Sequence, residues 1–252
     1  MLLSLENWFL FHPAPADHWD PPPSEIHAHD VELALGDGVT IHAWWCPTES
    51  WEPNKGALLY CHGNAGNLSF RGPNIARFQQ SLGIAVLIFD YPGFGRSTGR
   101  PTEAGCYAAA DAAYDWLIAK QNIAPKDVIL YGRSLGGAVA TELATRKPHR
   151  ALVLASSFTS IPDMAQTTFP WLPARWLVRN RFDNLAKIAQ CVGPVFVAHG
   201  TADSLIPFAH GERLFAAARE PKQFRAMSGL EHNHAPDETF YDALGEFLDK
   251  AR

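Results

Sequence analysis

The chain contains the run Val128-Ile129-Leu130-Tyr131-Gly132-Arg133-Ser134-Leu135-Gly136, and this stretch decides the fold. Its apolar first part predicts a buried strand, and residues 135–145 have the length and composition of a helix. A serine between such a strand and such a helix, with glycines around it, is typical of a sharp turn that exposes a nucleophilic hydroxyl. Side chains in place of Gly132 and Gly136 would collide with the neighbouring backbone. The alternative interpretation is a serine that caps the helix.

Other short apolar runs alternate along the chain with helix-length segments. The apolar runs occupy residues 57–61, 84–89, 128–131, 151–154 and 195–198, and the helix-length segments occupy residues 73–82, 102–119, 135–145, 208–218 and 237–249. Strands that are apolar on both faces are typical of a parallel sheet covered by helices. The alternation therefore predicts an α/β fold with a mostly parallel central sheet flanked by helices.

The remaining segments predict the edges of this fold. Residues 31–35 and 39–45 are strand-like and are joined by a Gly-Asp-Gly turn, which indicates an antiparallel edge hairpin. Residues 1–29 are rich in proline and predict an irregular lead-in, whereas the aromatic, proline-broken residues 156–184 predict a short helical cap insertion. No linker divides the chain, so residues 1–252 are predicted to form a single domain.

The composition excludes several classes of protein. Of the 252 residues, 47% are hydrophobic and 19% are charged, a balance typical of a folded globular chain. The net charge is -5 and no dense run of Lys and Arg occurs, so no nucleic-acid partner is expected. The 4 cysteines lie far apart and are predicted to be buried thiols rather than a disulfide framework.

The first eleven residues are mostly apolar but are interrupted by Glu6 and Asn7, and they lack a basic region and a cleavage site. A bilayer-spanning helix needs roughly 20 apolar residues, so no integral membrane segment is predicted here. We expect residues 1–11 to pack on the domain, with a peripheral membrane contact as the alternative. A cytoplasmic location is the default expectation.

A serine hydroxyl needs a base, an acid that orients the base, and donors for the oxyanion. Asp203 is the candidate acid because it lies in a turn-forming loop beyond the apolar run 195–198. The alternative role for Asp203 is to cap the helix that begins near Pro207. Asp163 and Asp183 are rival acids within the insertion.

The base is expected in the loop after the last predicted strand, residues 223–227. His232 and His234 both lie in this loop and compete for the role. A His-x-His pair can also indicate a metal site, but no third or fourth ligand stands nearby in the sequence. Neither a metal nor a cofactor is therefore predicted.

Two backbone N–H groups are candidates for an oxyanion hole. One belongs to Leu135, the residue after the serine. The other is expected in the loop His62-Gly63-Asn64-Ala65-Gly66-Asn67, where Gly63 allows a close backbone approach and Asn64 follows it. The alternative is a glycine-rich turn in which Asn64 caps the next helix.

Five motifs in order along the chain resemble those of α/β-hydrolases. They are the runs at 62–67, 89–97, 132–137, 199–203 and 229–233. The likeness extends from about Val31 to the C-terminus, and the group it points to is the small-capped serine hydrolases related to serine aminopeptidases and protein depalmitoylases. Many members of that group carry a membrane-anchoring helix at the N-terminus, a place that residues 1–11 occupy here.

The resemblance implies that Ser134, Asp203 and His232 form a catalytic triad, in the chain order expected of α/β-hydrolases. It favours His232 over His234, because the family pattern Gly-x-Gly-His-Asn-Asp aligns with Gly-Leu-Glu-His-Asn-His in this chain. The second glycine and the final acid of that pattern are replaced here. Asp90 also belongs to a family motif, and we expect it to be structural because it follows the wrong strand for a triad acid.

The sequence predicts a serine hydrolase that cleaves a carboxylic ester or thioester of a small molecule or an acylated substrate. Phe158, Trp171 and Trp176 in the insertion are the candidates for an apolar substrate pocket. One alternative is a serine peptidase, similar to an aminopeptidase, that acts on short peptides. The other alternative is a non-catalytic binding protein on a hydrolase scaffold, since a fold does not imply a function.

Overall fold

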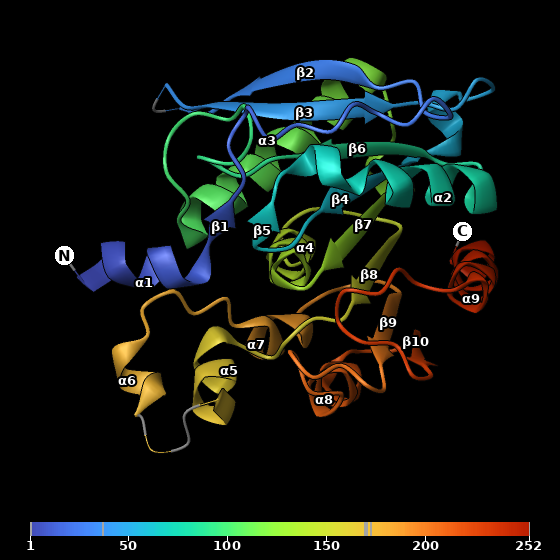
Figure 1. Ribbon diagram of the computed structural model, residues 1–252. Helices are drawn as coiled ribbons and strands as arrows, with labels where there is room; N and C mark the ends of the chain where they lie inside the picture. Colours follow the sequence, from blue (N-terminus) through green and yellow to red (C-terminus); the bar gives the residue numbers. More distant parts are fainter. Residues whose placement is uncertain (1, 37, 169–170, 172, 252) are drawn as a thin grey trace.

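A twisted sheet of eight strands runs through the middle of the molecule (Figure 1). The computed structural model describes residues 2–36, 38–168, 171 and 173–251, so Asp37 in the expected hairpin turn and Phe169 in the insertion lie outside the described residues. The strands are β1 His12–Pro13, β2 His29–Ala34, β3 Thr40–Cys46, β4 Ala57–Cys61, β5 Ala65–Gly66, β6 Ala85–Phe89, β7 Val128–Arg133, β8 Ala151–Ala155, β9 Val195–Gly200 and β10 Lys222–Met227.

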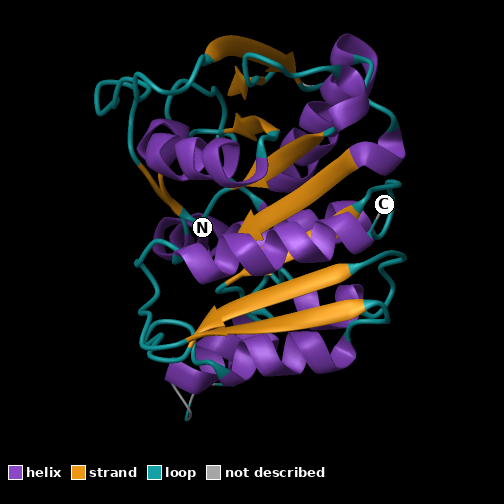
Figure 2. Cartoon of the chain, turned by 90° about the vertical axis from the view of Figure 1, so that its right-hand side faces the viewer, coloured by secondary structure: helices purple, strands orange, loops and turns teal. Residues whose placement is uncertain are grey.

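The sheet order is β10-β9-β8-β7-β4-β6-β3-β2. Every pair from β10 to β6 is parallel, whereas β3 pairs antiparallel with both β6 and β2. Figure 2 shows neighbouring arrows of the parallel part pointing the same way. Strands β1 and β5 form a separate two-stranded parallel sheet. Since parallel strands end at the same edge, the loops after β4, β7, β9 and β10 gather there.

Helices cover both faces of the sheet (Figure 2). They are α1 Leu2–Leu10, α2 Gly72–Leu82, α3 Glu103–Gln121, α4 Leu135–Ala144, α5 Ile161–Thr168, α6 Ala174–Leu177, α7 Asn184–Ile188, α8 Ala209–Ala217 and α9 Glu238–Lys250, with short 3-10 turns η1 Pro53–Lys55, η2 Leu68–Arg71 and η3 Pro125–Asp127. Alternate residues of the inner strands enter two separate hydrophobic clusters. One cluster includes α3, α4 and α8, and the other includes α2 and α9, which is why these strands are apolar on both faces.

The structure confirms the expected fold: a mostly parallel central sheet, flanking helices and an antiparallel hairpin at the N-terminal edge. All cysteines are free and buried, as expected. The lead-in differs from the irregular segment that its prolines suggested, because it begins with helix α1 and contains strand β1. The pairing of β1 with β5 joins residues more than fifty positions apart, so no local pattern could reveal it. Within the described residues, no helix is both long and apolar enough to cross a membrane.

Gly136 in the first turn of α4 offers a test of how tightly the sheet and this helix approach each other. A Cβ atom at Gly136 would lie 1.9 Å from the carbonyl oxygen of Cys61, and backbone cannot yield as a flexible side chain does. We expect Gly136→Ala to lower the free energy of unfolding by more than about 3 kcal/mol, measured by urea denaturation.

Gly245 in α9 is the matched control for this substitution. Its Cβ would meet only the end of the Leu82 side chain, at 3.4 Å. Because alanine favours a helix over glycine, Gly245→Ala should change stability by about +0.5 to +1 kcal/mol. Equal effects of the two substitutions would contradict the close approach at Gly136.

Candidate active site

Ser134 occupies the turn between β7 and α4 in a conformation that L-residues rarely adopt, with φ 54° and ψ -121°. Such a conformation costs on the order of 1–3 kcal/mol and persists only where neighbours hold it. Here the Ser134 N–H donates to the carbonyl of Ala155 at 3.0 Å, and the Ser157 hydroxyl donates to the carbonyl of Ser134 at 2.9 Å. The turn therefore holds the hydroxyl at the edge of the sheet instead of letting it cap the helix, and no side-chain cap bond is made.

The flanking glycines are required by the turn, as the sequence predicts. A Cβ at Gly132 would lie 2.3 Å from the carbonyl oxygen of Gly136, and a Cβ at Gly137 would lie 2.2 Å from the Ser157 hydroxyl. The start of α4 thus packs directly on the strand before it. This leaves the Leu135 N–H at the first position of the helix, where an N–H has no partner within the helix.

Helix α8 has Phe208 as its N-cap residue and no side-chain cap bond, so the alternative in which Asp203 caps this helix is wrong. Asp203 instead contacts His232 and residues of its own loop. Its Oδ1 accepts hydrogen bonds from the N–H groups of Leu205 at 3.1 Å and Ile206 at 2.7 Å, which fixes the turn before α8. Its Oδ2 lies 2.8 Å from Nδ1 of His232. A carboxylate only accepts, so the proton between these two atoms belongs to Nδ1, and a neutral His232 keeps Nε2 as a free acceptor.

His199 contacts Asp203 from the opposite side and was not singled out from the sequence. It is fully buried at the end of β9, and its Nε2 lies 2.8 Å from the carbonyl oxygen of Ile206 and 3.4 Å from Oδ2 of Asp203. A carbonyl also only accepts, so this Nε2 carries a proton that faces the carboxylate as well. The signal that could have found it is a histidine that ends a buried strand four residues before the acid.

These contacts determine the ionisation of Asp203. Burial alone would raise the pKa of the carboxyl, but hydrogen bonds from His199, His232 and the Ile206 N–H lower it well below its usual range. The carboxylate therefore stays charged throughout the neutral pH range. A charged acid beside Nδ1 stabilises the imidazolium that forms when His232 takes up a second proton.

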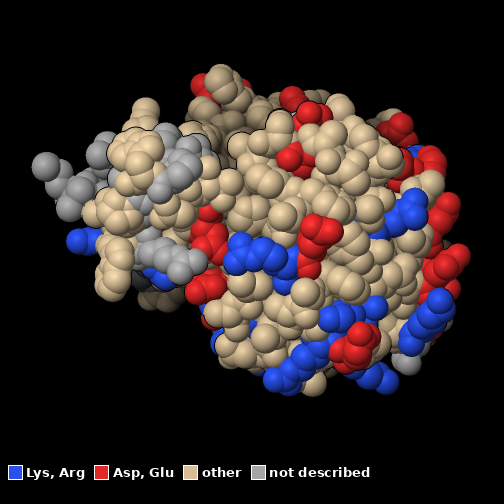
Figure 3. All heavy atoms as spheres, turned by 90° about the horizontal axis from the view of Figure 1, so that it is seen from below, with Lys and Arg blue, Asp and Glu red and all other residues tan. Residues whose placement is uncertain are grey.

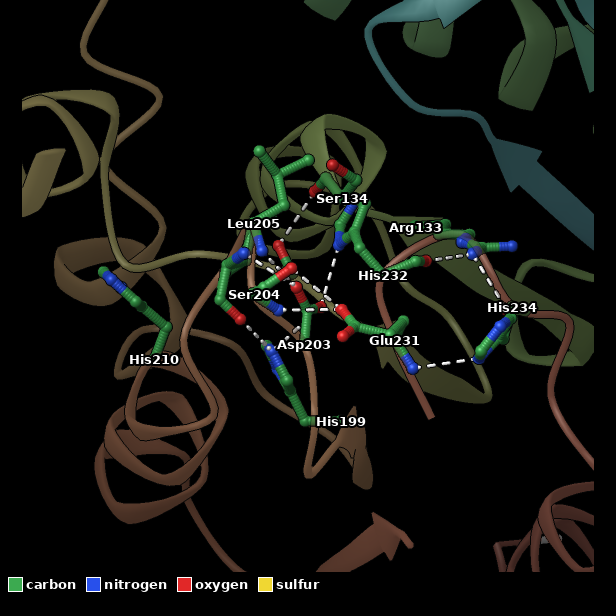
Figure 4. A network of polar contacts seen from close by, with 12 residues as sticks. Arg133, Ser134, His199, Asp203, Ser204, Leu205, His210, Glu231, His232 and His234 are labelled. Atoms are coloured by element: carbon green, nitrogen blue, oxygen red, sulfur yellow. Dashed lines mark hydrogen bonds and ion pairs between the residues drawn. The ribbon is translucent and has the colours of Figure 1, made fainter. Parts of the chain in front are cut away.

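The loop after β10 brings His232, and not His234, to the acid (Figure 4). Arg133 donates to the carbonyl of His232 and, at 3.1 Å, to that of His234, which ties the loop to the turn that carries Ser134. Glu231 accepts from the Ser204 N–H at 3.1 Å and from its hydroxyl at 2.9 Å, which ties the loop to that of Asp203. His234 accepts from the Glu231 N–H at 3.1 Å and braces the same loop.

The loop after β4 passes beside the serine, because a Cβ at Gly63 would lie 3.6 Å from Cβ of Ser134. Its conformation is held from behind. The Tyr91 hydroxyl donates to the carbonyl of His62 at 2.7 Å, and Oδ1 of the fully buried Asp90 lies 3.2 Å from Nε2 of His62. Asp90 supports the loop next to Asn64, in agreement with the structural role expected for it.

The rival acids of the insertion make contacts elsewhere. Asp183 caps α7 by accepting from the Ala186 N–H at 3.2 Å. Asp163 accepts from the Thr159 hydroxyl at 2.9 Å and from Arg213 at 3.2 Å. None of these contacts involves His232, whereas Asp203 contacts it directly. Among the described residues, no group of three or more His, Cys, Asp or Glu is arranged to hold a metal ion.

The aromatic residues expected to line a pocket have unequal surroundings. Phe158 is buried in the hydrophobic core, whereas Trp171 is 79% exposed and Trp176 is 89% exposed. Apart from atoms in grey, the lobe at the left of Figure 3 shows few Lys, Arg, Asp or Glu side chains, and both signs mix over the rest of that face. A pocket formed by these three residues stays a prediction.

A family model described as alpha/beta hydrolase fold matches residues 56–187. The chain belongs to the α/β-hydrolase family. Membership of this family supports a hydrolase function.

Among relatives of this chain, the uncharacterized protein Rv2307c of Mycobacterium tuberculosis is 39% identical over 87% of this chain and 78% of its own length. Protein bem46 of Schizosaccharomyces pombe is 30% identical over 90% of this chain and 79% of its own length. Among solved structures, a Pyrococcus furiosus esterase has a TM-score of 0.75 at 20% identity, covering 96% of this chain and 98% of the esterase. An acetyl xylan esterase from a Paenibacillus species has a TM-score of 0.72 at 19% identity, covering 99% of this chain and 92% of that enzyme.

Because the pKa of Asp203 is lowered, its contribution to the free energy of unfolding should depend on pH. Its pKa is lower in the folded than in the unfolded chain, so the folded chain binds fewer protons between the two values. The stabilisation is present above the unfolded pKa of about 3.9 and is lost as the pH falls toward the folded value. We expect the gap in unfolding free energy between wild type and Asp203→Asn to shrink as the pH is lowered from about 6 to about 3.

Urea denaturation at a series of pH values measures this gap. The matched control is Asp242→Asn, which removes an exposed carboxylate from α9. A gap for Asp203→Asn that stays constant over the same range would contradict the lowered pKa.

Proposed function

We propose that the protein is a serine hydrolase that cleaves a carboxylic ester or thioester through an acyl-enzyme on Ser134. The observation that carries this proposal is the 2.8 Å contact of His232 Nδ1 with Asp203 Oδ2, in a loop tied by Arg133 to the turn of Ser134. This contact leaves Nε2 of His232 as the only ring nitrogen able to accept a proton from a hydroxyl. The three side chains thus have the parts that nucleophilic catalysis by serine needs.

The first half-reaction forms the acyl-enzyme. Ser134 Oγ attacks the carbonyl carbon, its proton passes to Nε2 of His232, and the carbonyl oxygen becomes an oxyanion. The N–H groups of Leu135 and Asn64 stabilise that negative charge, and the positive end of the α4 helix dipole adds to it. The tetrahedral intermediate then collapses, the bond to the leaving oxygen or sulfur breaks, and the leaving group takes the proton from His232.

The second half-reaction releases the acid. Water attacks the acyl carbonyl while it gives a proton to Nε2 of His232, and the same N–H groups stabilise the second oxyanion. Collapse of this intermediate breaks the bond to Oγ, which recovers its proton from His232. The products are a carboxylic acid and the alcohol or thiol, and no cofactor is needed.

The expected substrate is a small-molecule ester or an acylated molecule with an apolar part. The fold relatives described as esterases support an ester, and the family supports only the wider class of hydrolase. A contact of residues 1–11 with a membrane surface stays a prediction. It is supported by two aromatic side chains of α1, because Trp8 is 68% and Phe9 is 65% exposed.

Ser134→Ala tests the nucleophile. Without Oγ no acyl-enzyme forms, so a fluorophosphonate probe should label the wild-type protein at one serine and leave the variant unlabelled. Asp203→Asn should keep a nucleophile but lower kcat by about 10⁴-fold, because the asparagine favours the wrong tautomer of His232. Labelling that survives in Ser134→Ala, measured by mass spectrometry of the adduct, would exclude Ser134 as the nucleophile.

A substrate series separates the ester reaction from its alternatives. We expect hydrolysis of p-nitrophenyl acyl esters with an optimum at one acyl length, and kcat/KM for aminoacyl-p-nitroanilides lower by at least about a hundredfold. Faster cleavage of the anilides would favour a peptidase. The absence of both turnover and probe labelling over the whole series would favour a binding protein on a hydrolase scaffold.

A further inference from the structure

The N-terminal segment crosses the loop that carries the candidate oxyanion donor Asn64. The side-chain amide of Asn64 donates to the carbonyl of Leu10 at 2.7 Å, and the backbone carbonyl of Asn64 accepts from the His12 N–H at 2.8 Å. The Ala14 N–H donates to the carbonyl of Gly66 at 2.9 Å. We call residues 6–14 the N-terminal strap. Figure 1 shows it passing from α1 through β1 toward the loop with β5.

The C-terminal end of α1 offers a hydrogen-bond acceptor to the side chain of Asn64. The last carbonyls of a helix have no partner within the helix. Helix α1 ends at Leu10, and the amide of Asn64 supplies a donor to that carbonyl. The chain then turns into β1, whose first N–H supplies the bond to the Asn64 carbonyl. The strap therefore forms hydrogen bonds with both the backbone and the side chain of Asn64.

The loop needs such support because of its own composition. Asn64 lies between Gly63 and Gly66, and glycine leaves a backbone free to adopt many conformations. Tyr91 and Asp90 bind His62 at the start of the loop, and Asp90 also accepts from the Leu68 N–H at 2.8 Å, beyond its end.

Within the loop, Nδ1 of His62 lies 2.7 Å from the carbonyl oxygen of Gly63, which shares a peptide with the Asn64 N–H, and Arg71 donates to the carbonyl of Ala65 at 2.6 Å. The strap adds the contacts at Asn64 itself, to its side-chain amide and to its carbonyl.

An apolar anchor fixes the strap on the body of the protein. Phe11 is 3% exposed and belongs to the main hydrophobic cluster. Its ring packs edge-on against Phe94, which follows β6, and against Phe182 in the insertion, each at 6.3 Å between ring centroids. The strap is consequently held between the sheet edge and the insertion.

Hydrogen bonds of Glu6 and Asn7 fix the other end of the strap to the insertion. The Glu6 carboxylate accepts from the N–H of Arg179 at 3.1 Å, and from the N–H and side-chain amide of Asn180 at 2.6 and 2.8 Å. Asn180 is 5% exposed, so its amide depends on protein partners, and it also donates to Asn7 at 2.8 Å. Hydrogen bonds to a charged acceptor in such surroundings are the stronger kind.

We propose that the strap positions the Asn64 N–H as an oxyanion donor, with Glu6 and the Asn64 side chain as positioning residues. This inference rests on the proposed function, in which that N–H meets the oxyanion. An oxyanion donor removed altogether costs about 10²–10³ in rate. A displacement of about 1 Å can cost up to about 10²-fold. Loosening the strap should therefore slow the chemical step while leaving Ser134, Asp203 and His232 in place.

The test compares variants of the full chain. We expect Asn64→Ala to lower kcat/KM for a p-nitrophenyl ester by about 30-fold and Glu6→Ala by about tenfold, mainly through kcat, since the two side chains bond Leu10 and Asn180 of the protein itself. Glu6→Gln keeps an acceptor oxygen for the Asn180 N–H and should recover most of the activity. Glu25→Ala, which removes an exposed carboxylate farther along the lead-in, is the matched control and should leave activity unchanged.

A transition-state analogue separates positioning from general stability. A trifluoromethyl ketone adds to a reactive serine and forms an oxyanion in the same place. Its Ki should rise in each variant by the same factor by which kcat/KM falls, as expected for groups that act on the transition state. Thermal unfolding of every variant shows which of them are folded at the assay temperature. Glu6→Gln and Glu6→Ala act far from the loop and keep the test open if Asn64→Ala does not fold.

The outcomes distinguish this inference from the function on which it rests. Ser134-dependent turnover with unchanged kcat/KM and Ki in folded Glu6→Ala and Asn64→Ala would overturn the strap's role and leave the proposed function intact. Activity that persists in Ser134→Ala would overturn the proposed function. A fall in kcat/KM with no parallel rise in Ki would also count against positioning of the oxyanion donor.

Discussion

The first turn of α4 lies directly on the end of β4, with no space for a Cβ atom between Gly136 and the carbonyl oxygens of Cys61 and His62. This contact fixes the end of one strand against the helix that follows another. Because the serine precedes the helix and the glycine-rich loop follows β4, the nucleophile and the candidate oxyanion donor approach each other by the same packing. The remaining features of the site are arranged around this fixed pair.

Asp203 and His232 lie on loops after β9 and β10, and several hydrogen bonds hold these loops in place. Asp203 receives donors on both oxygens, which allows a buried carboxylate to remain ionised. The loop of His232 is tied to its neighbours by Arg133 and by Glu231. The second glycine and the final acid of the family pattern are replaced here by Glu231 and His234, which contact each other. The loop thus keeps a defined path by a different set of bonds.

Local patterns predicted the features that depend on neighbouring residues. The buried strands, the sharp turn at Ser134 and the loop of Asp203 all follow from apolar runs and from glycine spacing. The choice of His232 over His234 came only from the family resemblance, since both lie in one loop and its path is set by distant partners. Packing of residues 1–11 on the domain was expected, but the contacts of the strap with Asn64 were missed because they join distant positions. Asn180 donates a hydrogen bond to Glu6, more than a hundred and seventy positions away, and a local sequence pattern cannot predict such a contact.

The segment that contacts the loop at Asn64 lies outside the part of the chain that the family model matches. The family model matches residues 56–187, so the recognisable core starts some forty residues after the strap ends. A chain trimmed to a boundary drawn from that core would keep the packing of β4, β7 and α4, yet it would leave the carbonyl and amide of Asn64 facing solvent. Fusion partners and affinity tags placed at the first residue would adjoin the same element. In a chimera of two relatives, the lead-in and the loop at Asn64 would have to come from the same parent to keep these contacts.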